Sequence, residues 1–93
     1  MVKEFEFNEE KNIWLKETRG ISFDDIVKAI KNGNVLDDIS HPSEKFPRQR
    51  LLVIKEKKYI YAVPYVKSAK DTLFLKTIYP SRVLTKKYLK KIL

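Results

Sequence analysis

The chain has 93 residues, a net charge of +8 and no cysteine, which allows one compact domain and excludes disulfides, thiolate zinc sites and thiol nucleophiles. Hydrophobic residues make up 43% and charged residues 34% of the chain, a composition typical of a globular protein rather than a disordered one. Purely apolar runs are only a few residues long, such as Leu51-Leu52-Val53-Ile54. We therefore expect one domain over residues 1–93, with no membrane span or signal peptide, in the cytoplasm.

The net charge is distributed unevenly along the chain. Residues 1–45 carry ten acidic and seven basic side chains, a net charge of −3, whereas residues 46–93 carry two acidic and thirteen basic side chains, a net charge of +11. Because lysines and arginines neutralise phosphates, the second half is predicted to bind a polyanion such as RNA. The alternative is a basic surface that contacts an acidic protein.

The first half of the chain is predicted to form a strand and two helices. Alternating side chains predict the strand over residues 2–7. Asn8 is a suitable N-cap for a helix that ends at Gly20, and Ser22 for the helix that follows. Trp14 is predicted to anchor the first helix in the core rather than to expose its ring for base stacking. The predicted buried stripe of the second helix is Phe23, Ile26, Val27 and Ile30.

The second half is predicted to form a meander of strands followed by a helix. The side-chain pattern predicts strands over residues 35–39, 48–55, 59–66 and 72–79. Pro64 predicts a bulge or an edge, because proline donates no ladder hydrogen bond. Thr85 is the predicted cap of the last helix. The expected order is βααββββα, an α+β domain with a mainly antiparallel sheet, two N-terminal helices and a short C-terminal helix.

Few kinds of active site are compatible with this composition. One histidine and no cysteine leave no Cys/His metal cluster, and two glycines leave no phosphate-binding glycine loop. We expect no cofactor and no metal ion, and we interpret Asp24-Asp25 and Asp37-Asp38 as helix-start and strand-end charges. The remaining groups suit RNA cleavage, because RNA supplies its own 2′-hydroxyl nucleophile. The protein then needs only to orient the phosphate, stabilise its charge and help to move protons.

Arginines are the first candidates for such a site, because the guanidinium group binds phosphate through two parallel charge-assisted hydrogen bonds. Arg48 and Arg50 lie on one face of a predicted strand and Arg82 follows the last strand, so we expect these arginines to converge on one phosphate. Tyr79 offers a stacking face or a proton donor, and His41 is either a general base or an ordinary loop residue. The cations predicted to bind the RNA backbone are Arg19, Arg48, Lys76 and Lys86.

Two stretches of the chain resemble a known family. The opening, FEFNEEKN at residues 5–12 followed by RGISFDD at residues 19–25, resembles the opening of BrnT-type toxins, which continues into a KHGVSF-like junction. The segment IYPSRVLT at residues 78–85 resembles their IISARKAT ending before a short last helix. The resemblance covers nearly the whole chain in element order and length.

This resemblance implies a RelE/ParE-like fold and toxicity through metal-independent mRNA cleavage, as in type II toxin–antitoxin systems. It also implies neutralisation by a cognate antitoxin, expected to be a ribbon–helix–helix protein, with DNA contacted only through the antitoxin complex. By resemblance, Arg82 and either Arg48 or Arg50 take the family's arginine positions, and Glu44 a preceding acid. The family's Lys-His before the glycine is replaced by Thr18-Arg19, so the general base stays open among Glu44, His41 and Tyr79. The alternative is a non-catalytic module of the same fold that binds RNA or protein.

Overall fold

The computed structural model describes residues 4–56 and 59–92, and for residues 89–92 only the helical backbone. The predicted strand residues Val2 and Lys3 and the predicted turn residues Lys57 and Lys58 lie outside the described residues. Along the chain the described elements are β1 (Glu4–Phe7), α1 (Glu9–Arg19), α2 (Phe23–Lys31), β2 (Val35–Ser40), β3 (Arg50–Glu56), β4 (Tyr59–Ala69), β5 (Thr72–Leu75), β6 (Tyr79–Pro80) and α3 (Arg82–Ile92).

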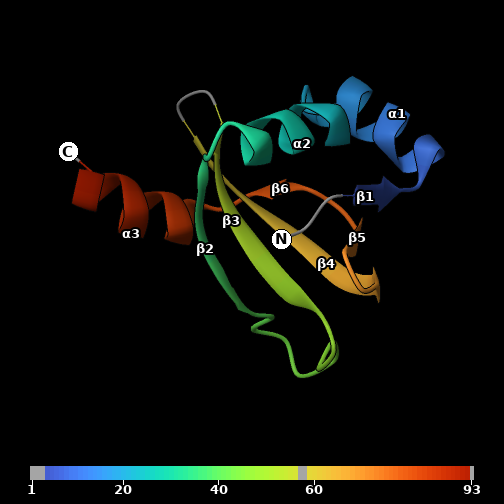
Figure 1. Ribbon diagram of the computed structural model, residues 1–93. Helices are drawn as coiled ribbons and strands as arrows, with labels where there is room; N and C mark the ends of the chain where they lie inside the picture. The colour runs from blue at the N-terminus through green and yellow to red at the C-terminus, as the bar shows by residue number, and fades with distance from the viewer. Residues whose placement is uncertain (1–3, 57–58, 93) are drawn as a thin grey trace.

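The strands form one mixed sheet with the order β1-β5-β4-β3-β2, and β6 pairs with β4 beyond the end of β5 (Figure 1). Every pair in this described sheet is antiparallel except β1 with β5, which is parallel. The prediction of an α+β domain with a mainly antiparallel sheet is therefore confirmed. No helix within the described ranges is long and apolar enough to cross a membrane.

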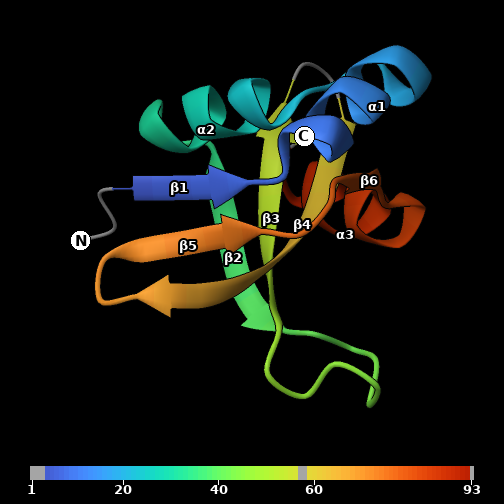
Figure 2. The same cartoon turned by 90° about the vertical axis from the view of Figure 1, so that its right-hand side faces the viewer.

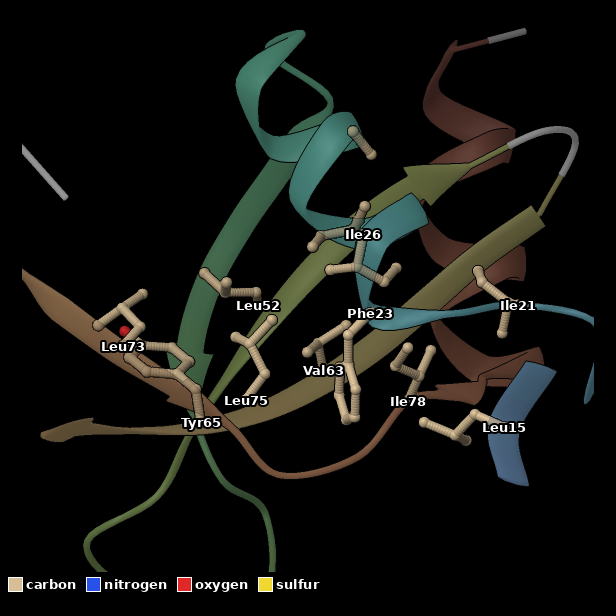
Figure 3. Packing of buried hydrophobic residues seen from close by; sticks show 12 residues of the cluster. Leu15, Ile21, Phe23, Ile26, Leu52, Val63, Tyr65, Leu73, Leu75 and Ile78 are labelled. Atoms are coloured by element: carbon tan, nitrogen blue, oxygen red, sulfur yellow. The ribbon is translucent and has the colours of Figure 1, made fainter. Parts of the chain in front are cut away.

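The helices cover opposite faces of the sheet, which we call the α1/α2 face and the α3 face (Figures 1 and 2). On the α1/α2 face, Leu15 and Phe23 from the helices pack with Leu52, Ile54 and other strand residues in the main core (Figure 3). The intervening residues of β3 point the other way because side chains alternate along a strand. On that side the hydroxyl of Tyr88 of α3 donates to Oδ2 of Asp37 (2.7 Å), which pairs with Val53.

The helix boundaries in the first half follow the predicted capping chemistry. The side chain of Asn8 accepts from the N–H of Lys11 (2.9 Å), and Gly20 ends α1 with a left-handed φ of 68°. Ser22 and Asp25 form a reciprocal capping box at the start of α2. Of the predicted α2 stripe, Phe23 and Ile26 are fully buried, while Val27 and Ile30 are half-buried at its margin.

The prediction that Trp14 anchors α1 in the core is wrong. Trp14 is 44% exposed and Leu15 is fully buried, so the neighbouring leucine takes the core position of that helical turn. The second buried residue of α1 is polar: Asn12 Oδ1 accepts from the N–H of Phe23 (2.6 Å), and its amide donates to Asp24 (3.2 Å). Asn12 thereby fixes the corner between α1 and α2 by satisfying a buried backbone donor.

The predicted strand over residues 72–79 is split. β5 ends at Leu75, and after a short irregular segment β6 pairs with a different stretch of β4. The predicted cap of the last helix also moves: Ser81 Oγ accepts from the N–H of Leu84 (3.1 Å), so α3 begins at Arg82 rather than after Thr85. The strand expected to start at Arg48 starts at Arg50 instead.

Pro64 lies neither at a bulge nor in an edge strand, contrary to the prediction. It pairs with Leu51 in β4, a central strand, and the register shift of β4 comes later, between Lys67 and Ala69. The carbonyl of Pro64 accepts from the N–H of Lys76 (2.8 Å), on the side away from β3. The N–H and C=O of one strand residue point the same way. The missing donor of Pro64 therefore faces the break between β5 and β6, where no ladder bond is required.

Candidate functional site

A basic pocket lies on the α1/α2 face of the sheet, where Arg50 of β3 and Tyr65 of β4 line it. Figure 2 shows that α1 and α2 lie over the other end of these two strands. The volume of the pocket is about 360 Å³. Four of its lining side chains are cationic and one is a carboxylate, so the pocket attracts anions. The residues that line this basic pocket are Arg48, Arg50, Tyr65, Lys67, Lys70, Asp71 and Leu73.

Arg50 is held in the basic pocket by Asp38 of the neighbouring strand β2. Its Nε donates to Asp38 Oδ1 (3.0 Å) and its Nη2 donates to the Asp38 carbonyl (2.9 Å). The hydrogen bond and the charge of Asp38 raise the pKa of Arg50, so the guanidinium group stays charged. Two of its five N–H groups are used in this way, and its side chain is 48% exposed, which leaves donors for an anion.

Tyr65 completes this arrangement from β4. Its hydroxyl donates to Asp38 Oδ2 (2.7 Å), its backbone pairs with Arg50, and only 7% of the residue is exposed. Figure 3 shows Tyr65 beside Leu73 at one margin of the core. Burial, followed by the hydrogen bond to Asp38, raises the pKa of Tyr65 to about 12. The hydroxyl of Tyr65 therefore stays protonated at neutral pH and donates its hydrogen bond. Arg50 of β3 and Tyr65 of β4 together hold the Asp38 carboxylate in place.

A β-bulge in β2 places Asp38 on this face. Val35 pairs with Ile54 and Asp37 pairs with Val53, so Leu36 is the additional residue. Without the bulge, Val35 and Asp38 would point to opposite faces, because side chains alternate along a strand. With it, Val35 packs against the main core and Asp38 reaches Arg50 on the same face. Asp37 points to the other face, where its Oδ2 accepts from Tyr88 of α3 (2.7 Å).

The Asp38–Arg50 pair contributes to position rather than to stability. Both side chains are nearly half exposed, and ion pairs of that kind stabilise a fold very little. What the pair does is to restrict the rotamers of a long side chain and direct its planar donors into the basic pocket. Such an oriented guanidinium group is suited to a phosphate or carboxylate ligand.

The first testable consequence concerns the pH dependence of stability through Tyr65. A tyrosine with a pKa of about 12 in the folded chain and about 10 in the unfolded chain stabilises the fold below pH 10. That contribution is lost as the pH rises toward 12. We expect the unfolding free energy of the wild type, relative to Tyr65→Phe, to fall by about 2 kcal/mol between pH 9 and pH 12 in urea titrations. A difference that stays constant over this range would contradict the assigned contacts of Tyr65.

The structure does not bring Arg82 to the basic pocket. Ser81, at the start of α3, donates its N–H to the Ile60 carbonyl (3.1 Å), and Ile60 pairs with Lys55. Lys55 is five residues along β3 from Arg50, a distance of about 17 Å. Arg82 is exposed and lines a separate pocket of about 440 Å³ with Tyr59, Val83, Thr85 and Lys86. The expected convergence of Arg50 and Arg82 on one phosphate is therefore not observed.

Tyr79 is also separated from the basic pocket, because it lies on the α3 face. It lines an apolar groove of about 350 Å³ with Ile39, Leu51 and Leu84, among others. Burial raises the pKa of Tyr79, so its hydroxyl remains protonated at neutral pH. Its protonated hydroxyl can donate a proton but cannot act as a base. Arg50 lies on the opposite face of the sheet, so Tyr79 is not placed to exchange a proton with a group that Arg50 binds.

His41 and Glu44 lie in the loop between β2 and β3. The Nδ1 atom of His41 accepts from the N–H of Ser43 (3.0 Å), and its ring lies against Phe46 with a centroid distance of 5.0 Å. These contacts shape the loop, which favours the ordinary loop interpretation of His41 over a general base. Glu44 is exposed and is not among the residues that line the basic pocket.

The predicted RNA-binding cations do not gather in one site. Arg48 shares the basic pocket with Arg50, as the predicted common face of the two arginines implied. Arg19 donates to the Ile78 carbonyl, so it also joins the end of α1 to the segment between β5 and β6. Lys76 lies over the ring of Phe74, with 5.2 Å from Nζ to the centroid. Lys86 lies in the pocket of Arg82.

Sequence reasoning missed the partners of Arg50 in the basic pocket. The sequence pattern indicates Asp38 only as a strand-end charge, and it favours packing over a site role for strand tyrosines such as Tyr65. The predicted strand ends at residue 66, whereas β4 continues to Ala69 and includes Lys67; Lys70 lies in the turn that follows. A sequence signal existed for Lys67: it follows Tyr65 at a spacing of two and so shares its face. Among the described residues, no group of three or more His, Cys, Asp or Glu side chains is placed to hold a metal ion.

Comparisons with protein-family models, with curated proteins and with solved structures find no match for this chain. The site must therefore be interpreted from its own residues. Those residues form a basic pocket around an oriented arginine, in the half of the chain (residues 46–93) that carries thirteen of its twenty lysines and arginines.

Proposed function

We propose that the protein is an RNA-directed toxin that binds and cleaves mRNA, and that the basic pocket binds the backbone phosphate. The observation that carries this proposal is Arg50, which is oriented by Asp38 into a pocket that also holds Arg48, Lys67 and Lys70. The resemblance to BrnT-type toxins supports the same activity, and with it a RelE/ParE-like fold and action in the cytoplasm.

The proposed reaction uses the nucleophile of the RNA itself. The 2′-oxygen forms a bond to the adjacent phosphorus, and the bond from phosphorus to the 5′-oxygen of the next nucleotide breaks. The 2′-hydroxyl loses its proton and the leaving 5′-oxygen gains one, which leaves a 2′,3′-cyclic phosphate and a free 5′-hydroxyl. Arg50 stabilises the negative charge that develops on the phosphate oxygens. Glu44 stays the candidate for the proton transfers, because the contacts of His41 favour a loop role and the loop that carries Glu44 joins the start of β3 beside the pocket.

The same proposal includes a partner protein. A type II toxin is neutralised by a cognate antitoxin, for which we propose a ribbon–helix–helix protein encoded next to this chain. The complex, rather than this chain alone, would then contact DNA. A small helical, DNA-binding reading frame adjacent to the gene supports this pairing, and a solitary gene argues against it.

A second candidate function is a non-catalytic module that binds RNA without cleaving it. One observation favours it: Arg82 and Tyr79, two of the predicted catalytic residues, lie away from the basic pocket. Phosphate binding by Arg50 is common to both functions, so only the fate of the RNA separates them.

The test is incubation of the purified chain with single-stranded RNA in excess EDTA. We expect shortened RNA with 2′,3′-cyclic phosphate ends, because the proposed reaction requires no metal ion. Product ends are identified by mass spectrometry, and binding is followed in parallel by fluorescence anisotropy. RNA that is bound but stays intact would overturn cleavage in favour of the binding module, and RNA that is not bound would overturn both functions.

A further inference from the structure

Trp14 presents a large aromatic surface to solvent, although its helix has a core to pack against. It is 44% exposed, whereas Leu15 beside it is fully buried. Ile13 is 53% exposed in the same turn, so this part of α1 carries two adjacent apolar side chains outside the core. The packing of the domain therefore does not account for the indole, and its surface is available for a ligand.

Two cations lie on the Trp14 ring. Lys11 Nζ is 4.6 Å and Arg19 Cζ is 5.1 Å from the ring centroid. Arg19 is fixed there, because it also donates a hydrogen bond to the Ile78 carbonyl. Lys11 has a flexible side chain on the first turns of α1, so it is the cation that moves away when another group stacks on the ring.

Trp14 lines a shallow depression of about 690 Å³, which we call the Trp14 pocket. It contains a second aromatic–cation pair, Phe74 with Lys76, with 5.2 Å between Nζ and the ring centroid. Its two lysines exceed its single carboxylate, so it favours an anionic ligand. The residues that line it are Asn8, Glu10, Lys11, Trp14, Phe74 and Lys76.

We propose that the Trp14 pocket is a stacking subsite for an unpaired base of single-stranded RNA; this inference rests on the proposed RNA binding. Stacking of one base on an aromatic side chain changes affinity by about 5- to 150-fold. An exposed cation–π contact is worth only about 2- to 5-fold. A base therefore displaces Lys11 from the indole, and the freed ammonium group binds the adjoining phosphate.

The Trp14 pocket and the basic pocket are separate sites, although the segment of β5 contributes to both. Leu73 lines the basic pocket and Lys76 lines the Trp14 pocket. β5 ends at Leu75, and Phe74 points to the opposite face from Leu73 because side chains alternate along a strand. The subsite is therefore a second contact for the RNA, on the other side of β5 from the basic pocket. An acidic protein would use the cations but has no planar bases for the indole.

The experiment uses the emission of Trp14, the only tryptophan of the chain. The full chain is titrated with an oligouridylate of about ten nucleotides, and separately with inorganic polyphosphate of similar charge. We expect the RNA to quench the emission and polyphosphate to bind without quenching, because only RNA carries bases. Quenching by a polyglutamate peptide equal to that by RNA would overturn the base assignment in favour of an acidic protein partner.

Substitutions separate this inference from the proposed function. Trp14→Ala is expected to lower RNA affinity by about 5- to 150-fold and to change polyphosphate affinity by less than about two-fold, with Trp14→Phe in between. Ile13→Ala, which removes the neighbouring exposed side chain, is the matched control and is expected to change neither. The Tm of each variant is measured by thermal melting, and an unchanged Tm excludes unfolding as the cause of a lower affinity.

Two further outcomes have distinct meanings. If RNA binds Trp14→Ala as tightly as the wild type, the stacking subsite is wrong and the proposed RNA binding stands. If the wild type binds neither RNA nor polyphosphate, the proposed function is wrong and the stacking subsite falls with it.

Discussion

Replacement of Arg50 by alanine is expected to lower the affinity for single-stranded RNA by about 10- to 150-fold, the usual effect of losing hydrogen bonds to a charged group. Cleavage is expected to slow further, by about 100- to 1,000-fold in kcat, because the guanidinium group stabilises charge that grows in the transition state. The substitution also removes the cation that neutralises the Asp38 carboxylate. The unpaired carboxylate then repels phosphate from the basic pocket. Anisotropy titration and quantitative gel analysis of the RNA measure the two effects.

The controls for Arg50 separate its position from its charge. Lys31→Ala removes one exposed positive charge from α2, outside the basic pocket, and is expected to change RNA affinity by less than about two-fold. Asp38→Asn keeps the shape of the partner but weakens its hold on Arg50, so kcat is expected to fall more than affinity. An Arg50→Ala variant that matches Lys31→Ala in both measurements would remove the basic pocket from the proposed function.

The parts of the fold that sequence predicts correctly are those governed by local chemistry. Asn8, Gly20 and Ser22 act within one turn of their own helix, so capping rules identify them without knowledge of the tertiary structure. Likewise, side chains alternate along a strand, so the sequence alone places Arg50 and Leu52 on one face of β3 and Leu51 on the other. The same alternation placed Arg48 on the side of Arg50, and the two do share the basic pocket.

The parts that sequence does not predict depend on contacts between distant segments. The bulge at Leu36 lets Val35 pack against the core while Asp38 binds Arg50 on the same face. Both contacts are with residues distant in sequence, so no local pattern predicts the bulge. Trp14 and Leu15 are adjacent large apolar residues on one helix, and only the position of the sheet decides which of them is buried.

The prediction that Tyr79 and Arg82 lie near Arg50 failed because the chain leaves the sheet after β5, beside Pro64 of β4. Apolar residues from Leu73 to Tyr79 suggest one strand, but Lys76 donates to the Pro64 carbonyl and the chain then leaves the ladder. This break moves Tyr79 to the α3 face. It also directs α3 to the end of β4 that is distant from Arg50, which separates Arg82 from the basic pocket.

The basic pocket depends on how far α1 and α2 extend over the sheet, and Phe23 is the residue that holds them there. It is fully buried, and its ring stacks on Phe7 of β1 with a centroid distance of 4.9 Å and an interplanar angle of 23°. Its backbone N–H is also the donor to Asn12, which fixes the corner between the helices. One residue thus contacts the edge strand and the main core through its side chain and the helix corner through its backbone N–H.

Phe23→Ala is expected to lower the free energy of unfolding by about 3–5 kcal/mol, since it removes a buried ring and leaves a cavity. That is a large share of the roughly 5–15 kcal/mol available to a domain, and corresponds to a Tm lower by about 12–40 °C. Urea denaturation measures the loss. Phe46→Ala is the matched control, because Phe46 is 44% exposed in the β2–β3 loop, and it is expected to cost less than about 1 kcal/mol. Equal losses for the two variants would mean that α2 is not held to the sheet through Phe23.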